Sequence, residues 1–254
     1  MGGLVVNRFQ NKNVLVTGAA SGIGRATAVR LAAEGARVFG LGRDVAGLAE
    51  TARLIVGSDR FTPFTADLTH ESSLVAAVEA ARTTMGSIDI LANIAGMTDR
   101  TPADAVTVEQ LTGVFMVNTI GPMLLCREVI PHLPDGSGVI VNVCSTAATQ
   151  AHPGMSGYAS SKAALLSYSL SLAAELGERR IRVVPISPGG VRTPMMDGTI
   201  GALDPTWYSR LATLWHEPGA PEDLAAAIAF AASADGAYLN GAEMRVDGGA
   251  RSAM

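Results

Sequence analysis

The sequence has few residues of the kinds that build disulfide frameworks, metal sites or nucleic-acid-binding surfaces. Its two cysteines, Cys126 and Cys144, are too few for a disulfide framework, and we expect both to be small buried side chains. The four histidines have no spacing typical of metal ligands, so we expect no metal. The net charge is −4 and the chain has no basic stripe, which argues against a nucleic-acid partner.

Long hydrophobic runs and targeting signals are also missing from the sequence. The most apolar windows, such as residues 225–232, are too short to cross a bilayer. Residues 1–9 lack the long apolar core of a signal peptide, and position 6 is valine where a myristoylation signal after Gly2 requires serine or threonine. We therefore expect a cytoplasmic protein with no membrane partner.

The length and composition of the chain fit one α/β domain spanning residues 1–254. No stretch reads as a linker and no internal repeat is present. Hydrophobic residues make up 48% of the chain and charged residues only 17%, so we expect additional apolar surface to be buried between subunits.

A glycine-rich turn follows the first predicted strand, residues 13–18. The chain then enters a predicted helix at 22–34, and the glycines allow a tight bend, close approach of a ligand to the backbone and close packing of helix on strand. The free N–H groups at such a helix N-terminus bind a pyrophosphate. The turn is therefore predicted to hold a dinucleotide; its glycines are Gly18, Gly22 and Gly24.

Strand and helix patterns alternate after this turn. The predicted elements are a strand at 36–41, a helix at 44–56, a strand at 61–66, a helix at 71–85 and a strand at 88–93. This alternation predicts a parallel, doubly wound sheet with helices on both faces, which is the Rossmann type of α/β fold. Asp67 ends the third strand and could accept from an adenine amino group, and small residues at 93–96 let a cofactor lie against the backbone.

Tyr158 and Lys162 stand four residues apart at the start of an apolar run rich in serine and alanine. If this run is a helix, both side chains rise from one face. A nearby ammonium group favours the phenolate and lowers a tyrosine pKa from its ordinary value of about 10. Because the chain has only two lysines, this spacing is seldom expected by chance, and we predict that Tyr158 is an acid–base group.

Ser145 follows the sequence V-I-V-N-V at 139–143, which predicts a buried parallel strand. Ligands of open α/β sheets bind at the carboxyl ends of the strands, so Ser145, Tyr158 and Lys162 are expected to converge on one crevice. A serine in this place is, by itself, equally typical of a turn or a helix cap.

Four segments together resemble the short-chain dehydrogenase/reductase family, in the branch whose chains have about this length. They are T-G-A-A-S-G-I-G at 17–24, N-I-A-G at 93–96, Ser145 thirteen residues before Tyr158, and Y-A-S-S-K at 158–162. The resemblance covers residues 13–249. It implies one Rossmann-type domain with a seven-stranded sheet, a nicotinamide dinucleotide, and a catalytic set of Asn118, Ser145, Tyr158 and Lys162. Ile94 departs from the family, which often has an asparagine there.

The resemblance also implies which residues hold the cofactor. They lie in the glycine turn, at the strand ends, in the catalytic set and in the turn S-P-G-G-V-R-T-P at 187–194, where Val191 and Thr193 would meet the nicotinamide carboxamide. The full set is Gly18, Ser21, Gly22, Ile23, Gly24, Arg43, Asp67, Leu68, Asn93, Ala95, Gly96, Tyr158, Lys162, Pro188, Gly189, Val191 and Thr193.

The end of the second predicted strand bears on the choice between NADP(H) and NAD(H). An NAD-binding chain has an acid about 20 residues beyond the glycine turn, whereas this chain has Gly42 there, followed by Arg43. This favours NADP(H), because a guanidinium pairs well with a 2′-phosphate. NAD(H) stays possible, because an arginine here also stacks on adenine and Asp44 could replace the missing acid.

The predicted mechanism reduces a ketone or oxidises a secondary alcohol. Ser145 donates a hydrogen bond to the substrate carbonyl, Tyr158 donates its proton as hydride arrives, and Lys162 binds the nicotinamide ribose and lowers the phenol pKa. In the family, the backbone carbonyl of the residue matching Asn118 holds a water beside the lysine. The alternative is a dinucleotide-binding sensor or scaffold without turnover, which has no chemical need of a phenol–ammonium pair.

Two further expectations concern the substrate and the assembly. Residues 194–218 interrupt the strand–helix alternation and are predicted to be a substrate-loop insertion. The segment is either a lid over an apolar substrate or a segment whose aromatic side chains pack on the rest of the domain or on a neighbouring subunit. Gln150, His152 and Met155 are candidates for the opposite wall. The helix that begins near Tyr158 is apolar on most sides, and such helices pair across a two-fold axis in the family, so we expect a homotetramer.

Overall fold

The computed structural model describes residues 7–57, 59–196, 213–214 and 217–250. Most of the predicted substrate-loop insertion at 194–218, including Trp207 and Trp215, lies outside the described residues.

Seven parallel strands form one sheet in the order β3-β2-β1-β4-β5-β6-β7. The chain starts at β1, runs outward to β3, and returns to pair β4 on the other side of β1. This reversal confirms the predicted doubly wound fold and creates a crevice at the carboxyl ends of β1 and β4. The strands are β1 (Asn13–Thr17), β2 (Arg37–Gly42), β3 (Phe61–Thr65), β4 (Ile90–Asn93), β5 (Val139–Val143), β6 (Arg182–Pro188) and β7 (Met244–Val246).

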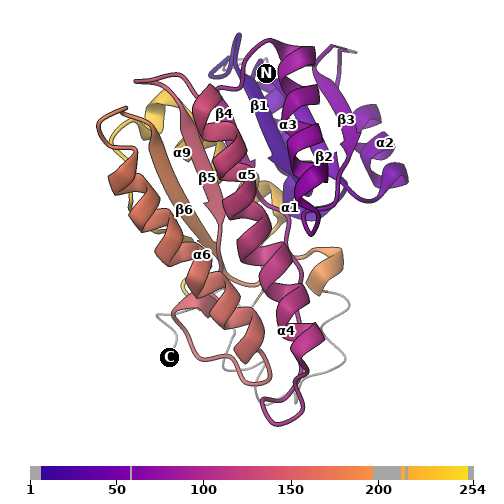
Figure 1. Ribbon diagram of the computed structural model, residues 1–254, viewed down its shortest axis with the longest axis vertical. Coiled ribbons are helices and arrows are strands. Elements are labelled where there is room, and N and C mark those ends of the chain that lie inside the picture. Colours follow the sequence, from indigo (N-terminus) through magenta and orange to yellow (C-terminus); the bar gives the residue numbers. More distant parts are fainter. Residues whose placement is uncertain (1–6, 58, 197–212, 215–216, 251–254) are drawn as a thin grey trace.

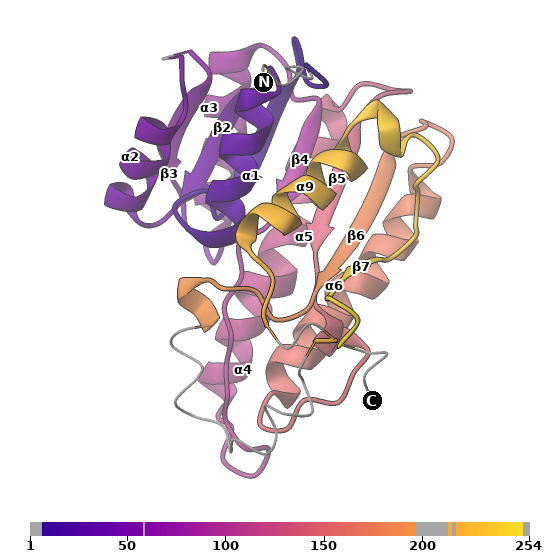
Figure 2. The same ribbon diagram turned by 180° about the vertical axis from the view of Figure 1, so that it is seen from behind.

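Helices cover both faces of the sheet. Figure 1 shows α3, α5 and α6 across one face, and Figure 2 shows α1 and α9 across the other. The carboxyl ends of the strands point toward the half of the molecule that holds α4 (Figure 1). The helices are α1 (Gly22–Ala33), α2 (Val45–Leu54), α3 (Glu71–Met85), α4 (Val108–Phe115), α5 (Gly121–Val129), α6 (Ser156–Glu175) and α9 (Pro221–Ala232).

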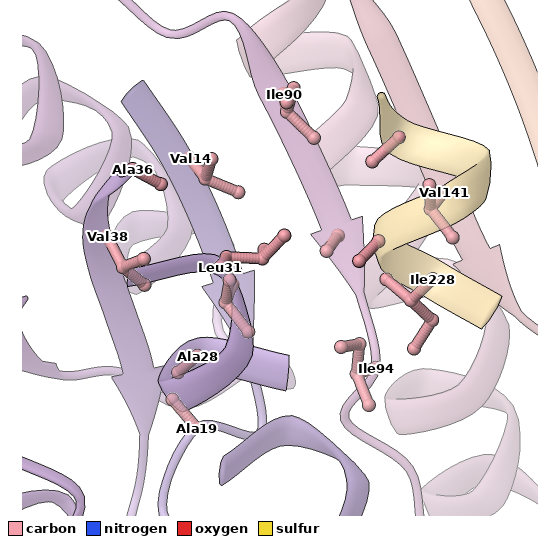
Figure 3. Close-up of a cluster of buried hydrophobic side chains, with 14 of the residues drawn as sticks. Val14, Ala19, Ala28, Leu31, Ala36, Val38, Ile90, Ile94, Val141 and Ile228 are labelled. Atoms are coloured by element: carbon pink, nitrogen blue, oxygen red, sulfur yellow. The ribbon is translucent and has the colours of Figure 1, made fainter. Parts of the chain in front are cut away.

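The central strands are buried on both faces, as a parallel sheet between two helical layers requires. Val14 of β1 points into the cluster under α1 and α9, where it lies with Leu31 and Ile228 (Figure 3). The next residue, Leu15, joins the opposite cluster under α3 and α5. Successive strand residues alternate between the two faces, and both faces are buried. The sequences of such strands are therefore continuous apolar runs and not alternating apolar and polar residues.

The long helical run from Val108 to His132 changes its winding in the middle. Between α4 and α5, residues Met116–Ile120 form one π-helical turn, and a short 3₁₀ turn at Ile130–His132 ends the run. The interruption thus directly precedes Gly121 and Pro122, and it contains Asn118. The cause is Pro122, which has no N–H to donate to the carbonyl four residues earlier, that of Asn118.

This same run is the one candidate for a membrane-spanning helix among the described residues. By length and composition alone, Val108–His132 is long and apolar enough to cross a membrane. In its most apolar stretch of 18 residues, 44% is buried inside the molecule. Leu125, Cys126 and Val129 of α5 belong to the core cluster on the sheet. A sheet-covering core helix meets the same length and composition test.

Candidate active site

Two adjoining cavities lie along the carboxyl edge of the sheet. One, of about 320 Å³, lies over the glycine turn and the ends of β2 and β3. The other, of about 350 Å³, lies over the end of β5 and the start of α6. Both linings include Ile23, Ile94, Gly96, Thr193 and Met195, so the two spaces are continuous with each other. The site therefore has the form of one groove with two halves.

The first cavity gathers most of the residues predicted to hold a dinucleotide. Besides Gly42 and Asp44, its lining includes Gly18, Ser21, Gly22, Ile23, Gly24, Arg43, Asp67, Leu68, Ala95, Gly96 and Thr193. These residues come from five separate segments, which only the sheet order brings together.

At two positions in the glycine turn, Gly18 and Gly24, the structure has no room for a side chain. Gly18 has a φ of +71°, in the left-handed region, and a methyl group there would meet the Ala95 backbone at 3.0 Å. A methyl group on Gly24 would overlap the carbonyl oxygen of Gly18. The turn thus brings the start of α1 against β1, and Gly22, Ile23 and Gly24 at the N-terminus of this helix line the cavity. A helix N-terminus has free N–H groups that suit a pyrophosphate.

Thr17 fixes the glycine turn to the neighbouring strand and was not singled out from the sequence. Its Oγ1 accepts hydrogen bonds from the backbone N–H groups of Ile94 at 2.9 Å and Ala95 at 3.0 Å. These bonds hold the segment after β4 against the end of β1. A threonine directly before the first glycine was the only local sign of this role.

Asn93 differs from the other predicted cofactor residues, because it lines neither cavity. Its side chain is buried, and Nδ2 donates to Asn142 Oδ1 at 2.9 Å and to Cys126 Sγ at 3.4 Å. Asn142 Nδ2 in turn donates to Ser169 Oγ at 2.9 Å. The side chain of Asn93 therefore joins β4 to β5 and α5 beneath the site, and Asn142 continues these bonds to α6. Asn93 points to this side because strand residues alternate between the two faces of the sheet.

Ser145, Tyr158 and Lys162 all line the second cavity, as their positions at one strand end and one helix start predicted. Ser145 caps a short 3₁₀ turn, Thr146–Ala148, and its Oγ accepts from the Ala147 N–H at 3.1 Å. The serine is thus both a cap and a cavity residue, the two alternatives left open by the sequence. Tyr158 and Lys162 rise from the first two turns of α6.

The pKa of Tyr158 is raised above its ordinary value, which corrects the expectation that Lys162 would lower it. Burial is the largest cause, because a desolvated phenolate is unfavourable. The Ser145 hydroxyl and the positive charge of Arg100 act in the opposite direction. Lys162 is not among the groups that shift this pKa, so in this protein the phenol stays protonated at neutral pH and is suited to donate a proton.

Lys162 is buried at the bottom of the cavity and its ammonium faces backbone rather than a carboxylate. Nζ donates to the carbonyl of Val143 at 2.8 Å, and a methyl group on Gly96 would lie 3.3 Å from Nζ. Burial lowers the pKa of this lysine to about 8. The absence of a side chain at Gly96 is what leaves room for the ammonium.

Asn118 is fully buried and uses its side chain to join three segments. Its Oδ1 accepts from the Met97 N–H at 2.8 Å, and Nδ2 donates to the Met97 carbonyl at 2.9 Å and to Ser161 Oγ at 3.0 Å. The amide group is therefore occupied by structural bonds. Only its backbone carbonyl, which Pro122 leaves without an α-helical donor, is available for the role that the resemblance implies.

Ser161 is a positioning residue that the sequence analysis did not identify. Its hydroxyl donates to the Tyr158 carbonyl at 2.7 Å and accepts from Asn118, while its own carbonyl accepts from Thr119 Oγ1 at 2.8 Å. The first turn of α6 is thus held against the π turn. The serine directly before the lysine in Y-A-S-S-K was the only signal available.

Replacing Ser161 by alanine is expected to lower the free energy of unfolding by about 1–3 kcal/mol, because one buried N–H of Asn118 loses its acceptor. We also expect kcat to fall severalfold, since the turn that carries Tyr158 is no longer tied to Asn118. Ser160→Ala is the matched control, because Ser160 is exposed on the same turn. Denaturant unfolding and steady-state kinetics of both variants test this, and equal behaviour of the two would contradict it.

The turn after β6 completes the groove. Pro188, Gly189, Val191 and Thr193 line the second cavity, and a methyl group on Gly22 would lie 3.1 Å from Thr193 Cγ2. The turn thus touches the glycine turn and bridges the two halves of the site.

The residues predicted to form a wall opposite the segment 194–218 line the second cavity, and they have polar neighbours that were not predicted. Gln150, His152 and Met155 line the second cavity together with Thr98 and Arg100 from the loop after β4. Burial, and in second place the charge of Arg100, lowers the pKa of His152. No group of three histidine, cysteine or acidic side chains suited to hold a metal ion occurs in the described ranges.

Comparison with known proteins matches residues 12–201 to the family model described as short chain dehydrogenase. The chain is 37% identical over 240 residues to 2-(R)-hydroxypropyl-CoM dehydrogenase of Xanthobacter autotrophicus, covering 92% of this chain and 96% of that one. It is 37% identical over 253 residues to D-threitol dehydrogenase of Mycolicibacterium smegmatis, covering 95% and 94%. The crystal structure of levodione reductase has a TM-score of 0.90 and 30% identity, covering 97% of this chain and all of that one.

Proposed function

The chain belongs to the short-chain dehydrogenase/reductase family, and from this premise we propose that it transfers hydride between NADP(H) and an apolar ketone or secondary alcohol. It is an NAD(P)-dependent oxidoreductase acting on a CH–OH or C=O group. The single observation that carries the proposal is the groove itself. Ser145, Tyr158 and Lys162 line one half of it, and the glycine turn lines the other half.

The groove fits a nicotinamide dinucleotide. Gly18 and Gly24 leave free the space that side chains would fill, and the N-terminus of α1 offers its N–H groups to a pyrophosphate. Thr193 and Val191 line the half that would take the nicotinamide, close to Lys162. When bound, the cofactor supplies or accepts the hydride.

The chain's own residues handle the substrate oxygen and its proton. Ser145 Oγ donates a hydrogen bond to the carbonyl oxygen, and Tyr158 gives its phenolic proton to the same oxygen. Because burial keeps the phenol protonated at neutral pH, this step is ready in the reductive direction. Lys162 keeps its positive charge beside Gly96, where it would bind the nicotinamide ribose.

Two features at the end of β2 support NADP(H). Arg43 is exposed on the lining of the first cavity and lies close enough to Asp67 for its charge to lower the pKa of that carboxyl. A side chain at Gly42 would begin 3.2 Å from the Ala20 methyl group, which leaves little room for an acid. Asp44 Oδ2 lies against Gly47 in the first turn of α2.

Arg43→Leu is expected to reduce the preference for NADPH over NADH, measured as the ratio of kcat/KM values, by about tenfold to hundredfold. A guanidinium–phosphate pair contributes about 1.5–3 kcal/mol, and 1.4 kcal/mol is a factor of ten. Arg53→Leu is the control, because Arg53 lies on the exposed side of α2 and pairs with Glu50. An unchanged ratio would remove Arg43 from this role, and a native preference for NADH would indicate that Asp44 holds the ribose.

The second cavity supports a substrate with an apolar body. Ile94, Met155, Val191, Met196 and Pro218 line it, and its volume of about 350 Å³ suits a small molecule. We further propose a cytoplasmic homotetramer. Apolar side chains on the outer faces of the long helices, Ile120, Met123 and Leu170, are between 36% and 42% exposed and would be covered in such an assembly.

The proposed function is tested by mixing the protein with NADPH or NADH and a panel of ketones, and by following the loss of reduced-nicotinamide absorbance. The panel spans acyl thioesters, steroids, quinones and small cyclic ketones, and each reaction is repeated with Tyr158→Phe. Oxidation of NADPH that depends on Tyr158 is the expected result. Binding of both cofactors without turnover of any ketone would instead support the sensor alternative.

A further inference from the structure

The side chain of Arg25 links α1 to α2 and to the glycine turn. Arg25 lies in the first turn of α1. Its Nη2 donates to the carbonyl oxygens of Ala20 at 2.5 Å and Gly47 at 3.2 Å, and its Nε donates to Thr51 Oγ1 at 3.1 Å. Ala20 belongs to the glycine turn, whereas Gly47 and Thr51 belong to α2. One guanidinium therefore holds the turn and the two helices together.

Thr51 holds the neighbouring peptide of the same turn. It is fully buried, and its Oγ1 donates to the Ala19 carbonyl oxygen at 2.7 Å, which is closer than its alternative acceptor, the Gly47 carbonyl oxygen at 3.0 Å. Side-chain donors thus hold the carbonyl groups of both Ala19 and Ala20. Because a peptide unit is planar and trans, they also fix the direction of the next N–H groups, those of Ala20 and Ser21. Both of these residues line the first cavity.

The first turn of α2 lies close against the glycine turn. A methyl group on Gly47 would lie 2.7 Å from the Ala20 carbonyl oxygen, and one on Gly42 would lie 3.2 Å from the Ala20 methyl group. Arg43 and Asp44, which directly precede α2, line the same cavity as the glycine turn. The position of α2 against the turn therefore sets how far Arg43 and Asp44 stand from the N-terminus of α1.

A bound dinucleotide would contact both of these places at once. Its pyrophosphate would lie at the N-terminus of α1, and its adenosine ribose would lie at Arg43 and Asp44. The 2′ substituent of this ribose distinguishes NADP(H) from NAD(H). A ligand that binds at two points binds most tightly when the protein already holds both points at the right separation.

We propose that Arg25 is a positioning residue that determines how strongly the protein discriminates between the two cofactors. It fixes the separation between the pyrophosphate site and the residues at the ribose, and it does so through Ala20 and α2. The inference rests on the proposed function for the identity of the cofactor. The link between the turn and the two helices rests on the hydrogen bonds alone.

A role of Arg25 through its charge alone would have a different effect on binding. The guanidinium places a positive charge next to the turn that would hold the pyrophosphate. NADP(H) and NAD(H) share that pyrophosphate, so loss of the charge would weaken the binding of both cofactors equally. Loss of positioning would instead weaken the contact with the ribose 2′ substituent, and so it would change the ratio of the two affinities.

Arg25→Met is expected to bring the ratio of the dissociation constants for NADPH and NADH about tenfold closer to one, because a mispositioned Arg43 loses one charge-assisted hydrogen bond to the 2′-phosphate. Titration of the protein with each reduced cofactor, followed by nicotinamide fluorescence, measures both constants and needs no substrate. Arg30→Met is the matched control, because Arg30 is exposed on the same helix and pairs with Glu34. It should keep the native ratio.

Two further variants separate the link from the charge. Arg25→Lys keeps the charge but lacks the planar fork that joins the turn to α2, so it should also move the ratio toward one. Thr51→Val keeps the shape of the side chain and removes its bonds to Ala19 and Arg25, so it should move the ratio severalfold in the same direction. This variant also tests the proposal if Arg25→Met does not fold.

Three results would overturn the proposal. The first is equal affinity of the native protein for NADPH and NADH, a measurement that needs no variant. The second is a native ratio in Arg25→Met, even if both cofactors bind more weakly. The third is a native ratio in Arg25→Lys, which would assign the effect to the charge.

The proposed function can fail separately from this inference. A ratio that depends on Arg25 in a protein that turns over no ketone would contradict the proposed reaction and support the positioning role. A native preference for NADH would contradict the choice of NADP(H), and Arg25→Met should then weaken that preference in the same way. Tyr158-dependent turnover together with a ratio that does not depend on Arg25 would contradict the positioning role alone.

Discussion

Tyr158→Phe is expected to lower kcat for ketone reduction by about 10²–10⁴-fold while leaving the affinity for NADPH nearly unchanged. The reason is that the phenol supplies the proton for the substrate oxygen, and a positioned general acid contributes a factor of this size. The ring itself stays in place, because phenylalanine fills the same space on α6. Stopped-flow or steady-state kinetics give the rate, and fluorescence of bound NADPH gives the affinity.

Tyr168→Phe is the matched control for this experiment. Tyr168 lies ten residues further along α6, packs against the core and lines neither cavity. Its loss of a hydroxyl should leave kcat close to that of the native protein. If Tyr158→Phe keeps more than a tenth of the native activity, Tyr158 is not the proton donor.

The raised pKa of Tyr158 also predicts how the reaction depends on pH. In the reductive direction the protonated phenol is the active form, so the Tyr158-dependent rate should hold across neutral pH. In the oxidative direction the phenolate is the active form, and because burial raises the pKa, this rate should keep rising through the alkaline range. An oxidative rate that is already level near neutral pH would contradict the direction of this shift.

Lys162→Met is expected to remove turnover and yet stabilise the fold. We expect kcat to fall by about 10²-fold or more, because the ammonium proposed to hold the nicotinamide ribose is lost and the cofactor is no longer positioned beside Tyr158. At pH 7 we also expect the free energy of unfolding to rise by about 1–3 kcal/mol, because a buried ammonium that faces only the Val143 carbonyl is exchanged for an apolar side chain of similar size.

The sign of the pH dependence follows from the lowered pKa. Lys162 has a pKa of about 8 in the folded protein against an ordinary lysine value of 10.5, so between these values the unfolded chain binds more protons and stability rises with pH. Below about pH 8 the ammonium is protonated in both states and its burial cost is fully present. The stability difference between Lys162→Met and the native protein should therefore shrink from pH 8 to pH 10.5.

Lys12→Met is the control, because Lys12 is the only other lysine in the sequence. Its side chain is partly exposed, and its Nζ lies 3.5 Å from Asp89 Oδ1. Denaturant unfolding at several pH values measures the effect. A Lys162→Met variant that is less stable than the native protein at pH 7 would contradict the burial cost assigned to the ammonium.

Local sequence determined the fold and much of the groove, because these depend on patterns within short segments. Apolar strand runs such as 139–143, separated by helical stretches, predicted the parallel sheet, and the strand ends agree with the structure to within a few residues. The left-handed backbone of Gly18 and the four-residue spacing of Tyr158 and Lys162 likewise need only their neighbours in the chain. Once the strands are parallel, their carboxyl ends and the turns after them must share one edge.

Tertiary structure decided the direction of side chains and the solvation of charges. Asn93 stands at the predicted strand end, but strand pairing turns its amide toward Asn142 rather than toward the groove. The raised pKa of Tyr158 and the lowered pKa of Lys162 come from burial, which no local pattern contains. Arg100 and His152 line the same cavity because β4 and β5 are neighbours in the sheet, and that order is fixed by packing over the whole domain.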